Sequence, residues 1–166
     1  MSKTIKLGIL GIDHGHIFDM LDEMLKEGCT CNHFWTDGFP LTLKQFNKKY
    51  PNIKKVDNKD VILSDNEIDM ILISSIPKDR ANLSIDALKA GKDVMVDKPG
   101  CITIEQLNNI KLAVKETGKI WSVNFSERFH VAAVAKAEEL VKLGKIGDIK
   151  QTIGTGPHRL GNYERP

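Results

Sequence analysis

The sequence contains few cysteines, few aromatic residues and no long apolar run. Three cysteines among 166 residues are an odd number and too few for a disulfide framework. The longest apolar stretch, residues 70–76, is far below the roughly 20 residues that a membrane-spanning helix needs. The start of the chain shows no long apolar segment of a secretion signal. We therefore expect a cytoplasmic protein with no membrane contact.

The charge balance also excludes one class of partner. The chain has 24 basic and 22 acidic residues, which is an ordinary balance for a globular protein. Lysines do cluster over residues 44–55, but few aromatic residues accompany them for base stacking. We interpret this cluster as a solvated helix face and expect no nucleic-acid partner.

Short apolar runs alternate with segments of helical spacing along the chain. Strands are predicted at residues 5–11, 33–35, 69–75, 93–96 and 120–125, and helices at residues 17–26, 41–50, 80–90, 103–118 and 131–143. Four of these helices end at a glycine, which adopts the left-handed conformation that a helix C-terminus often requires: Gly28, Gly91, Gly118 and Gly144. This alternation predicts an α/β fold, a Rossmann-type doubly wound parallel sheet with helices on both faces. Ligands of such sheets bind beyond the carboxyl ends of the strands.

The first predicted turn, residues 8–16, resembles a dinucleotide-binding turn only in part. Such a turn needs glycine at two positions and a small residue at a third. Counted from Gly11, these positions hold Gly11, Asp13 and His16, so a carboxylate lies where phosphates are expected. One interpretation is a modified cofactor turn in which Gly8, Gly11, Asp13, His14 and His16 contact the dinucleotide. The other is a generic connection between a strand and a helix.

Asp37 follows the second predicted strand. It lies about 20 residues after the first turn, the spacing of the acidic residue that binds the cofactor ribose. A carboxylate at this position accepts hydrogen bonds from the ribose 2′-hydroxyl and repels a 2′-phosphate. Asp37 therefore favours NAD over NADP as the cofactor. The alternative is a turn residue, since Asp37-Gly38 is common turn chemistry.

Lys98 follows a predicted strand within the tetrapeptide Asp97-Lys98-Pro99-Gly100. Proline restricts the backbone, so the lysine is held rigidly at the end of the strand. A lysine in a cleft can donate a proton to a carbonyl or stabilise a developing alkoxide. The tetrapeptide alone also fits an ordinary surface turn.

Two groups of residues contain types that bind metal ions. One is Asp13 with His14 and His16, and the other is Cys29 and Cys31 with His33. Neither group has the spacing of a zinc site, and no second ligand pair lies at a suitable distance. We therefore predict no metal ligand, and we expect His14 and His16 to contribute to the ligand cleft. A metal-dependent enzyme using these two histidines remains an alternative.

Five segments in the same order resemble one known family. Residues 94–99 resemble its hVhhEKP motif, and they are flanked by similar segments at residues 68–73, 87–92, 123–129 and 143–148. The chain thus resembles the Gfo/Idh/MocA family, named after glucose–fructose oxidoreductase, inositol 2-dehydrogenase and MocA, over nearly its whole length. Members of this family are NAD(P)-dependent oxidoreductases with a Rossmann domain followed by an α/β substrate domain.

The resemblance implies a domain division and a set of site residues. Residues 1–125 would form the cofactor-binding domain. Residues 126–166 would hold a crossover helix, a first strand near residues 149–153 and the tail of a substrate domain that is cut off. Lys98 would be the catalytic residue near the nicotinamide and substrate. The remaining cofactor contacts would be Ser74, Ser75, Pro77, Asp97 and Arg128.

The family also implies a substrate and an assembly. Its substrates are mostly sugars, inositols and related hydroxyl or carbonyl compounds, and the full-length form would be a homo-oligomer. This chain departs from the family pattern at Asp13, His16 and Arg80, and it has no counterpart of the second-domain histidine. An alternative is therefore a non-catalytic Rossmann-fold binding or regulatory module. The first interpretation predicts NAD binding with little turnover by this chain alone, and the alternative predicts no NAD binding.

Overall fold

The structure of the protein is a computed structural model, and the residues it describes are 3–125 and 131–155. The chain divides into two compact units, residues 1–124 and residues 125–166. The first unit contains the whole sheet and the predicted cofactor residues, apart from Arg128. Among the described residues, no helix is both long and apolar enough to cross a membrane.

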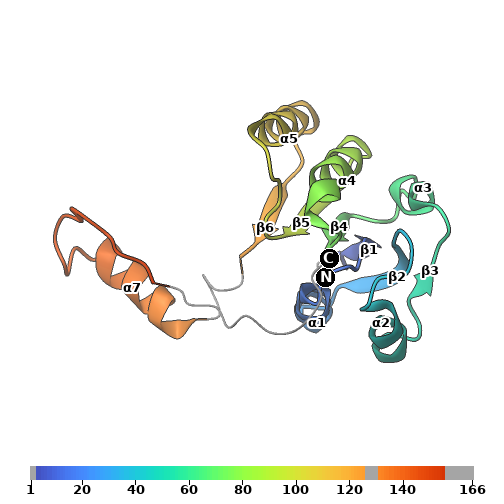
Figure 1. Cartoon of the computed structure of the whole chain (residues 1–166), viewed down its shortest axis with the longest axis horizontal. Coiled ribbons are helices and arrows are strands. Elements are labelled where there is room, and N and C mark those ends of the chain that lie inside the picture. The colour runs from blue at the N-terminus through green and yellow to red at the C-terminus, as the bar shows by residue number, and fades with distance from the viewer. Residues whose placement is uncertain (1–2, 126–130, 156–166) are drawn as a thin grey trace. The chain divides into compact units, whose positions relative to one another are not determined.

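The first unit is built on a sheet of six parallel strands in the order β3-β2-β1-β4-β5-β6 (Figure 1). The strands are β1 (Lys6–Leu10), β2 (Thr30–Trp35), β3 (Lys54–Lys55), β4 (Met70–Ile73), β5 (Asp93–Asp97) and β6 (Trp121–Asn124). The chain builds the sheet outward from β1 to β3 and then returns to add β4 on the other side of β1. This order confirms the predicted Rossmann-type doubly wound sheet. The order in which the chain adds strands reverses between β1 and β4, and ligands of such sheets bind at this point of reversal.

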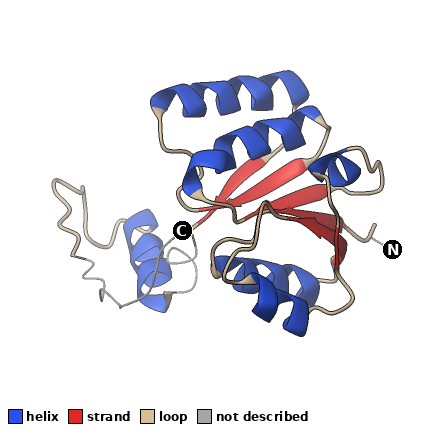
Figure 2. Cartoon of the chain, turned by 45° about the vertical axis from the view of Figure 1, so that its right-hand side comes forward, coloured by secondary structure: helices blue, strands red, loops and turns tan. Residues whose placement is uncertain are grey.

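Helices cover both faces of this sheet (Figure 2). They are α1 (His16–Lys26), α2 (Leu43–Lys49), α3 (Lys59–Leu63), α4 (Pro77–Lys89) and α5 (Ile104–Thr117). Leu7 and Ile9 of β1 belong to the core that also contains apolar residues of α1 and α2. Leu10 belongs to the core that contains apolar residues of α3, α4 and α5. Successive strand residues point to opposite faces, so the continuous apolar run of β1 serves both cores.

Local hydrogen bonds confirm both predicted ends of α5. Thr103 caps α5, since its side-chain oxygen accepts a hydrogen bond from the backbone N–H of Gln106 at 3.1 Å. The Gln106 side chain accepts in turn from the backbone N–H of Ile102 at 2.8 Å. At the other end of α5, Gly118 has φ +66°, the left-handed conformation expected there.

Several predicted element boundaries were wrong, and two short elements lie in segments for which no helix or strand was predicted. Strand β3 and helix α3 were not predicted, because their two and five residues are too few to show a period. Helix α4 begins at Pro77 rather than at residue 80, because proline suits the first helical position, where its missing N–H leaves no bond unmade. Strand β2 begins at Thr30 rather than at residue 33.

The second unit contains helix α7 (Ala132–Lys142). The strand predicted near residues 149–153 was wrong, because residues 143–155 form no strand. A strand requires a hydrogen-bonded neighbour, and the described part of this unit, residues 131–155, supplies none. The helix buries no side chain within the described residues.

Candidate functional site

Most of the predicted site residues lie where β1, β2, β4 and β5 end. The turn after β1 is tied to the neighbouring strand ends by backbone hydrogen bonds. Gly11 N–H donates to the Trp35 carbonyl at 2.7 Å, and His14 N–H donates to the Ser74 carbonyl at 3.1 Å. The Ser74 hydroxyl donates back to the His14 carbonyl at 3.1 Å. These bonds fix the first turn against the end of β4.

Gly11 is the point of closest approach in this turn. Its φ is +80°, and a Cβ placed there would lie 2.4 Å from the Cβ of Ser75 and 2.7 Å from its Cα. Both the conformation and the space therefore require glycine. Gly8 has a different role, because it lies within β1 and a Cβ there would meet the Ile62 side chain at 2.5 Å. The structure thus places Gly8 against α3 and outside the lining of the neighbouring pocket.

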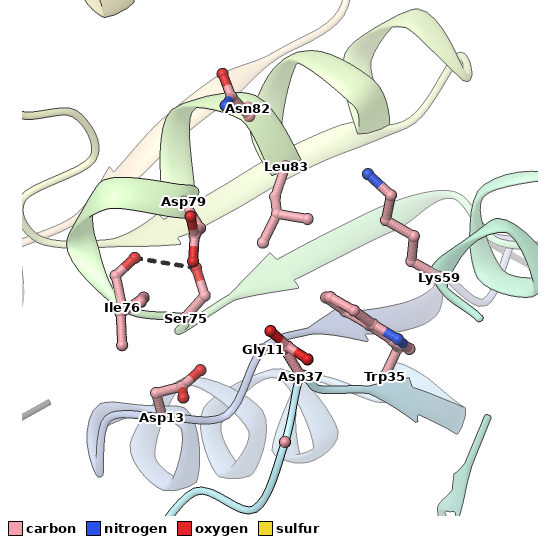
Figure 3. A pocket seen from close by; sticks show the side chains of 11 residues that line it. Gly11, Asp13, Trp35, Asp37, Lys59, Ser75, Ile76, Asp79, Asn82 and Leu83 are labelled. Atoms are coloured by element: carbon pink, nitrogen blue, oxygen red, sulfur yellow. Dashed lines mark hydrogen bonds between the residues drawn. The ribbon is translucent and has the colours of Figure 1, made fainter. Parts of the chain in front are cut away.

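A pocket of about 350 Å³ lies at the ends of β1, β2 and β4 beside the first turns of α4 (Figure 3). Four of the predicted cofactor residues line it: Gly11, Asp13, Asp37 and Ser75. Asp79 adds a third carboxylate, and Lys59 supplies a positive charge that also pairs with Asp86. Because three carboxylates face one amine, the pocket favours a ligand that presents hydroxyl or amine hydrogens.

The charge of Asp13 is opposed by its surroundings. Partial burial raises the pKa of the Asp13 carboxyl, and the nearby carboxylates of Asp79 and Asp37 raise it further. The negative charge of Asp13 is therefore less stable in this turn than in water.

The residues around this pocket fit part of a dinucleotide. Asp37 follows β2, where a ribose diol could donate to its carboxylate. Helix α1 begins after Gly15, and its first backbone N–H groups already have acceptors. His16 N–H donates to His14 Nδ1 at 3.4 Å, and Ile17 N–H donates to the His14 carbonyl at 3.2 Å. Asp37 therefore fits the cofactor ribose, whereas Asp13 and the occupied helix N-terminus weaken the fit at the pyrophosphate.

A second group of site residues gathers across the end of β4. The Asp97 carboxylate is completely buried, and both histidines of the first turn lie against it. His16 Nδ1 lies 2.7 Å from Asp97 Oδ1, and His14 Nδ1 lies 3.3 Å from Asp97 Oδ2. The two imidazole rings pack edge to face with centroids 4.2 Å apart. Burial lowers the pKa of His14, and His16, Arg80 and Lys98 lower it further, whereas the Asp97 carboxylate raises it. The net lowering favours the neutral imidazole of His14.

Arg80 of α4 binds this group through several hydrogen bonds and is itself 2% exposed. Its Nη2 donates to Asp97 Oδ2 at 3.0 Å, and its Nε donates to the Ser75 carbonyl at 2.7 Å. Its Nη1 donates to the carbonyls of Asp97 at 3.1 Å and Lys98 at 2.6 Å. From the sequence, Arg80 was identified only as a departure from the family pattern. The signal for its role was an arginine on the apolar face of a helix, since Ala81, Leu83, Ser84, Ala87 and Leu88 of that helix are also buried.

The structure therefore brings the predicted residues into two neighbouring groups. Gly11, Asp13, Asp37 and Ser75 line the pocket, while His14 and His16 meet Asp97. Lys98 follows Asp97 directly and is half-buried, and Pro77 is the first residue of α4. Arg128 lies outside the described residues.

Comparison with known proteins identifies the family. The family model described as an oxidoreductase family with an NAD-binding Rossmann fold matches residues 40–125, which are 86 of the 166 residues. The chain is similar to the NAD⁺-dependent scyllo-inositol 2-dehydrogenase of Bacillus subtilis, with 34% identity over 52% of this chain and 25% of that protein. It is also similar to the NADP⁺-dependent scyllo-inositol 2-dehydrogenase IolW of the same organism, with 24% identity over 88% of this chain and 40% of that protein.

A solved structure agrees over almost the whole chain. A provisionally named oxidoreductase from Erwinia carotovora atroseptica SCRI1043 matches with a TM-score of 0.91 and 35% identity, over 98% of this chain and 48% of that one. The chain thus spans less than half the length of this structure and of the curated relatives given above. The matched motifs, the strand order and the pocket agree with one another, and the chain belongs to the Gfo/Idh/MocA oxidoreductase family with its NAD-binding Rossmann fold.

Proposed function

We propose that this chain is the nucleotide-binding part of an NAD-dependent oxidoreductase that acts on a sugar, inositol or related hydroxyl or carbonyl compound. The observation that carries the proposal is Asp37. It follows β2 and lines a pocket whose neighbouring wall is the tight turn at Gly11. A dinucleotide-binding fold needs a carboxylate and a close backbone approach at these two places.

The preference for NAD over NADP rests on charge. The 2′-phosphate of NADP would be placed near Asp37, in a pocket that also contains the carboxylates of Asp13 and Asp79. Lys59 offers compensation, but its ammonium already pairs with Asp86. Relatives of this chain include dehydrogenases named for NAD⁺ and for NADP⁺, so the choice must come from residues of this chain.

In the proposed mechanism, the bound nicotinamide supplies the hydride acceptor or donor. Lys98 is the catalytic residue that orients the reacting oxygen of the substrate and assists its proton transfer. Arg80 holds the Lys98 carbonyl at 2.6 Å and the Asp97 carboxylate at 3.0 Å, which fixes the backbone that carries this lysine. Ser74, Ser75 and Pro77 shape the turn after β4, and His14, His16, Asp97 and Arg128 complete the proposed cofactor contacts. Gly8 is no longer among these contacts, because its position inside β1 packs against the side chain of Ile62.

The substrate class and the wider organisation follow from the family. Relatives are named as scyllo-inositol dehydrogenases and as a 1,5-anhydro-D-fructose reductase, which are enzymes of polyols and sugars. We propose that residues 1–125 bind the cofactor and that residues 126–166 begin the substrate domain. We also propose that the full-length protein is a cytoplasmic homo-oligomer.

The test is NAD binding by the purified chain and by an Asp37→Ala variant. Quenching of tryptophan fluorescence reports binding, because Trp35 lines the pocket. Loss of one charge-assisted hydrogen-bonding group costs about 1.5–3 kcal/mol, so Asp37→Ala should weaken NAD binding by roughly 10- to 150-fold. Asp57→Ala is the matched control, since Asp57 lies outside the pocket lining, and it should bind as the parent does.

The second candidate is a binding module that has lost dinucleotide chemistry. Asp13 favours it, because a carboxylate stands at a phosphate-binding position in a pocket that already holds two others. If the folded chain does not bind NAD at all, this second function replaces the first. Equal NAD binding by the parent and by Asp37→Ala would instead refute the role of Asp37.

A further inference from the structure

Three side chains with metal-binding atoms converge beside the pocket, where β1 and β5 end. His14, His16 and Asp97 each offer one donor atom, and the three atoms lie within 4.8 Å of one another. They form one such group within the part of the chain that the structure describes, residues 3–125 and 131–155. We propose that this triad binds one divalent transition-metal ion.

The donor set matches the chemistry of such ions. Two imidazole nitrogens and one carboxylate oxygen form the ligand set of many zinc and non-haem iron sites. Zinc lies about 2.0–2.2 Å from such atoms, which places tetrahedral ligands roughly 3.3 Å apart. The two Nδ1–oxygen separations to Asp97 are 2.7 Å and 3.3 Å. Small ring rotations would therefore open the triad around an ion, which would take the place of the His16–Asp97 hydrogen bond.

The burial of the triad indicates an open metal site rather than a closed structural one. The Asp97 side chain is fully buried, whereas the His14 and His16 side chains keep 39% and 28% of their surface exposed. Three protein ligands leave at least one position of a tetrahedral ion free for water or another oxygen ligand. Such a site could take a hydroxyl or carbonyl oxygen of a small molecule at the end of β4.

Arg80 acts as the outer support of this site and limits its affinity. Metal-binding carboxylates are usually hydrogen-bonded by a further group, and Arg80 Nη2 provides that bond to Asp97 Oδ2 at 3.0 Å. Arg80 and Lys98 both carry positive charge near the triad, and the Asp97 charge already balances one of them. Binding should therefore be weaker than at a zinc site with several anionic ligands. The imidazole pair favours zinc, cobalt, nickel or iron over magnesium and calcium.

The set differs from the one that the sequence suggested. Sequence spacing grouped the two histidines with Asp13, but the structure places Asp13 in the lining of the pocket. Asp97 takes its place from 81 residues away from His16. The proposal goes beyond the proposed function and does not depend on NAD binding.

The experiment is a titration of the purified, untagged chain with Co²⁺ after chelator treatment. Cobalt bound by nitrogen and oxygen ligands in a four-coordinate site gives intense visible absorption. We expect saturation at one Co²⁺ per chain and its displacement by Zn²⁺. His14→Asn and His16→Asn should each weaken the affinity by at least about 10-fold, because each removes one ligand. His33→Asn is the matched control, since His33 is a histidine of β2 outside the triad, and it should leave binding unchanged.

Two results would overturn the proposal. One is a folded chain that shows no saturable Co²⁺ absorption. The other is binding that survives both His14→Asn and His16→Asn or that His33→Asn abolishes. Circular dichroism of each variant confirms folding, and the partly exposed His14 provides a variant that should fold even if His16→Asn does not. A parallel NAD titration without metal separates the outcomes, because NAD binding with no cobalt signal refutes only the metal site.

Discussion

Replacement of Arg80 by methionine should destabilise the protein severely. The change removes the guanidinium that pairs with Asp97, whose side chain has no exposed surface. A buried charge that loses its partner costs about 3–5 kcal/mol, out of a total stability of about 5–15 kcal/mol. The carbonyls of Ser75 and Lys98 lose donors at 2.7 Å and 2.6 Å as well. For a chain of this length, the loss corresponds to a fall of roughly 6–20 °C in Tm.

Urea unfolding followed by circular dichroism at pH 7 measures this loss. Lys78→Met on the same helix is the control, because Lys78 lies outside the buried face of α4 and its substitution should change stability by less than about 0.5 kcal/mol. A double variant, Arg80→Met with Asp97→Leu, removes both charges and should recover part of the loss. A loss below about 1 kcal/mol in Arg80→Met would refute the reasoning, because the ion pair would then not hold the buried carboxylate.

Three further predictions concern the pocket and the core. Gly11→Ala should lower the free energy of unfolding by about 2–5 kcal/mol, because the new Cβ would lie 2.4 Å from the Cβ of Ser75 in a left-handed backbone conformation. Urea unfolding measures this loss, and a loss under about 1 kcal/mol would contradict the close approach. Asp13→Asn should stabilise the chain at pH 7 and strengthen NAD binding. The raised pKa of Asp13 means that the native state binds its proton more tightly than the unfolded state, so this residue's contribution to stability falls as pH rises from the unfolded pKa through the folded one. Unfolding at pH 3 and pH 7 checks the sign, because the advantage of the variant should vanish at pH 3; an equal advantage at both values would exclude titration as its cause. Burial raises the pKa of the Cys31 thiol to about 12, so in a Cys29→Ser, Cys101→Ser background its alkylation at pH 8 should be much slower when the chain is folded than in urea. Equal rates, followed by mass spectrometry, would show that the thiol is not protected.

Features set by neighbouring residues were predictable from the sequence. Both ends of α5 depend on residues within one helical turn, and the helix predicted at residues 103–118 agrees with its observed caps, Thr103 and Gly118. The apolar runs of β1 and β4 predicted a buried parallel sheet, which the strand order confirms. Helix α3 was missed although Asn58 carries a local signal, since its side chain accepts a hydrogen bond from the Asp60 N–H at 2.9 Å.

Features set by distant residues were not predictable. The meeting of His16 with Asp97 joins residues 81 positions apart, and no pattern along the chain specifies it. The role of Arg80 depends on carbonyls that come from two separate turns. The family resemblance implied a strand near residues 149–153, but the described residues 131–155 supply no neighbouring strand with which it could pair. Sequence therefore predicted the scaffold and the candidate residues but not their grouping.

The most direct test of the central claim is a calorimetric titration of the folded chain with NAD and, separately, with NADP. We expect saturable binding of NAD at one site and weaker binding of NADP, because the carboxylates of Asp13, Asp37 and Asp79 line the pocket in which we propose that the ribose binds. NADP binding equal to or tighter than NAD binding would contradict the role of Asp37. Binding of neither nucleotide would contradict the claim that this chain is a cofactor-binding domain.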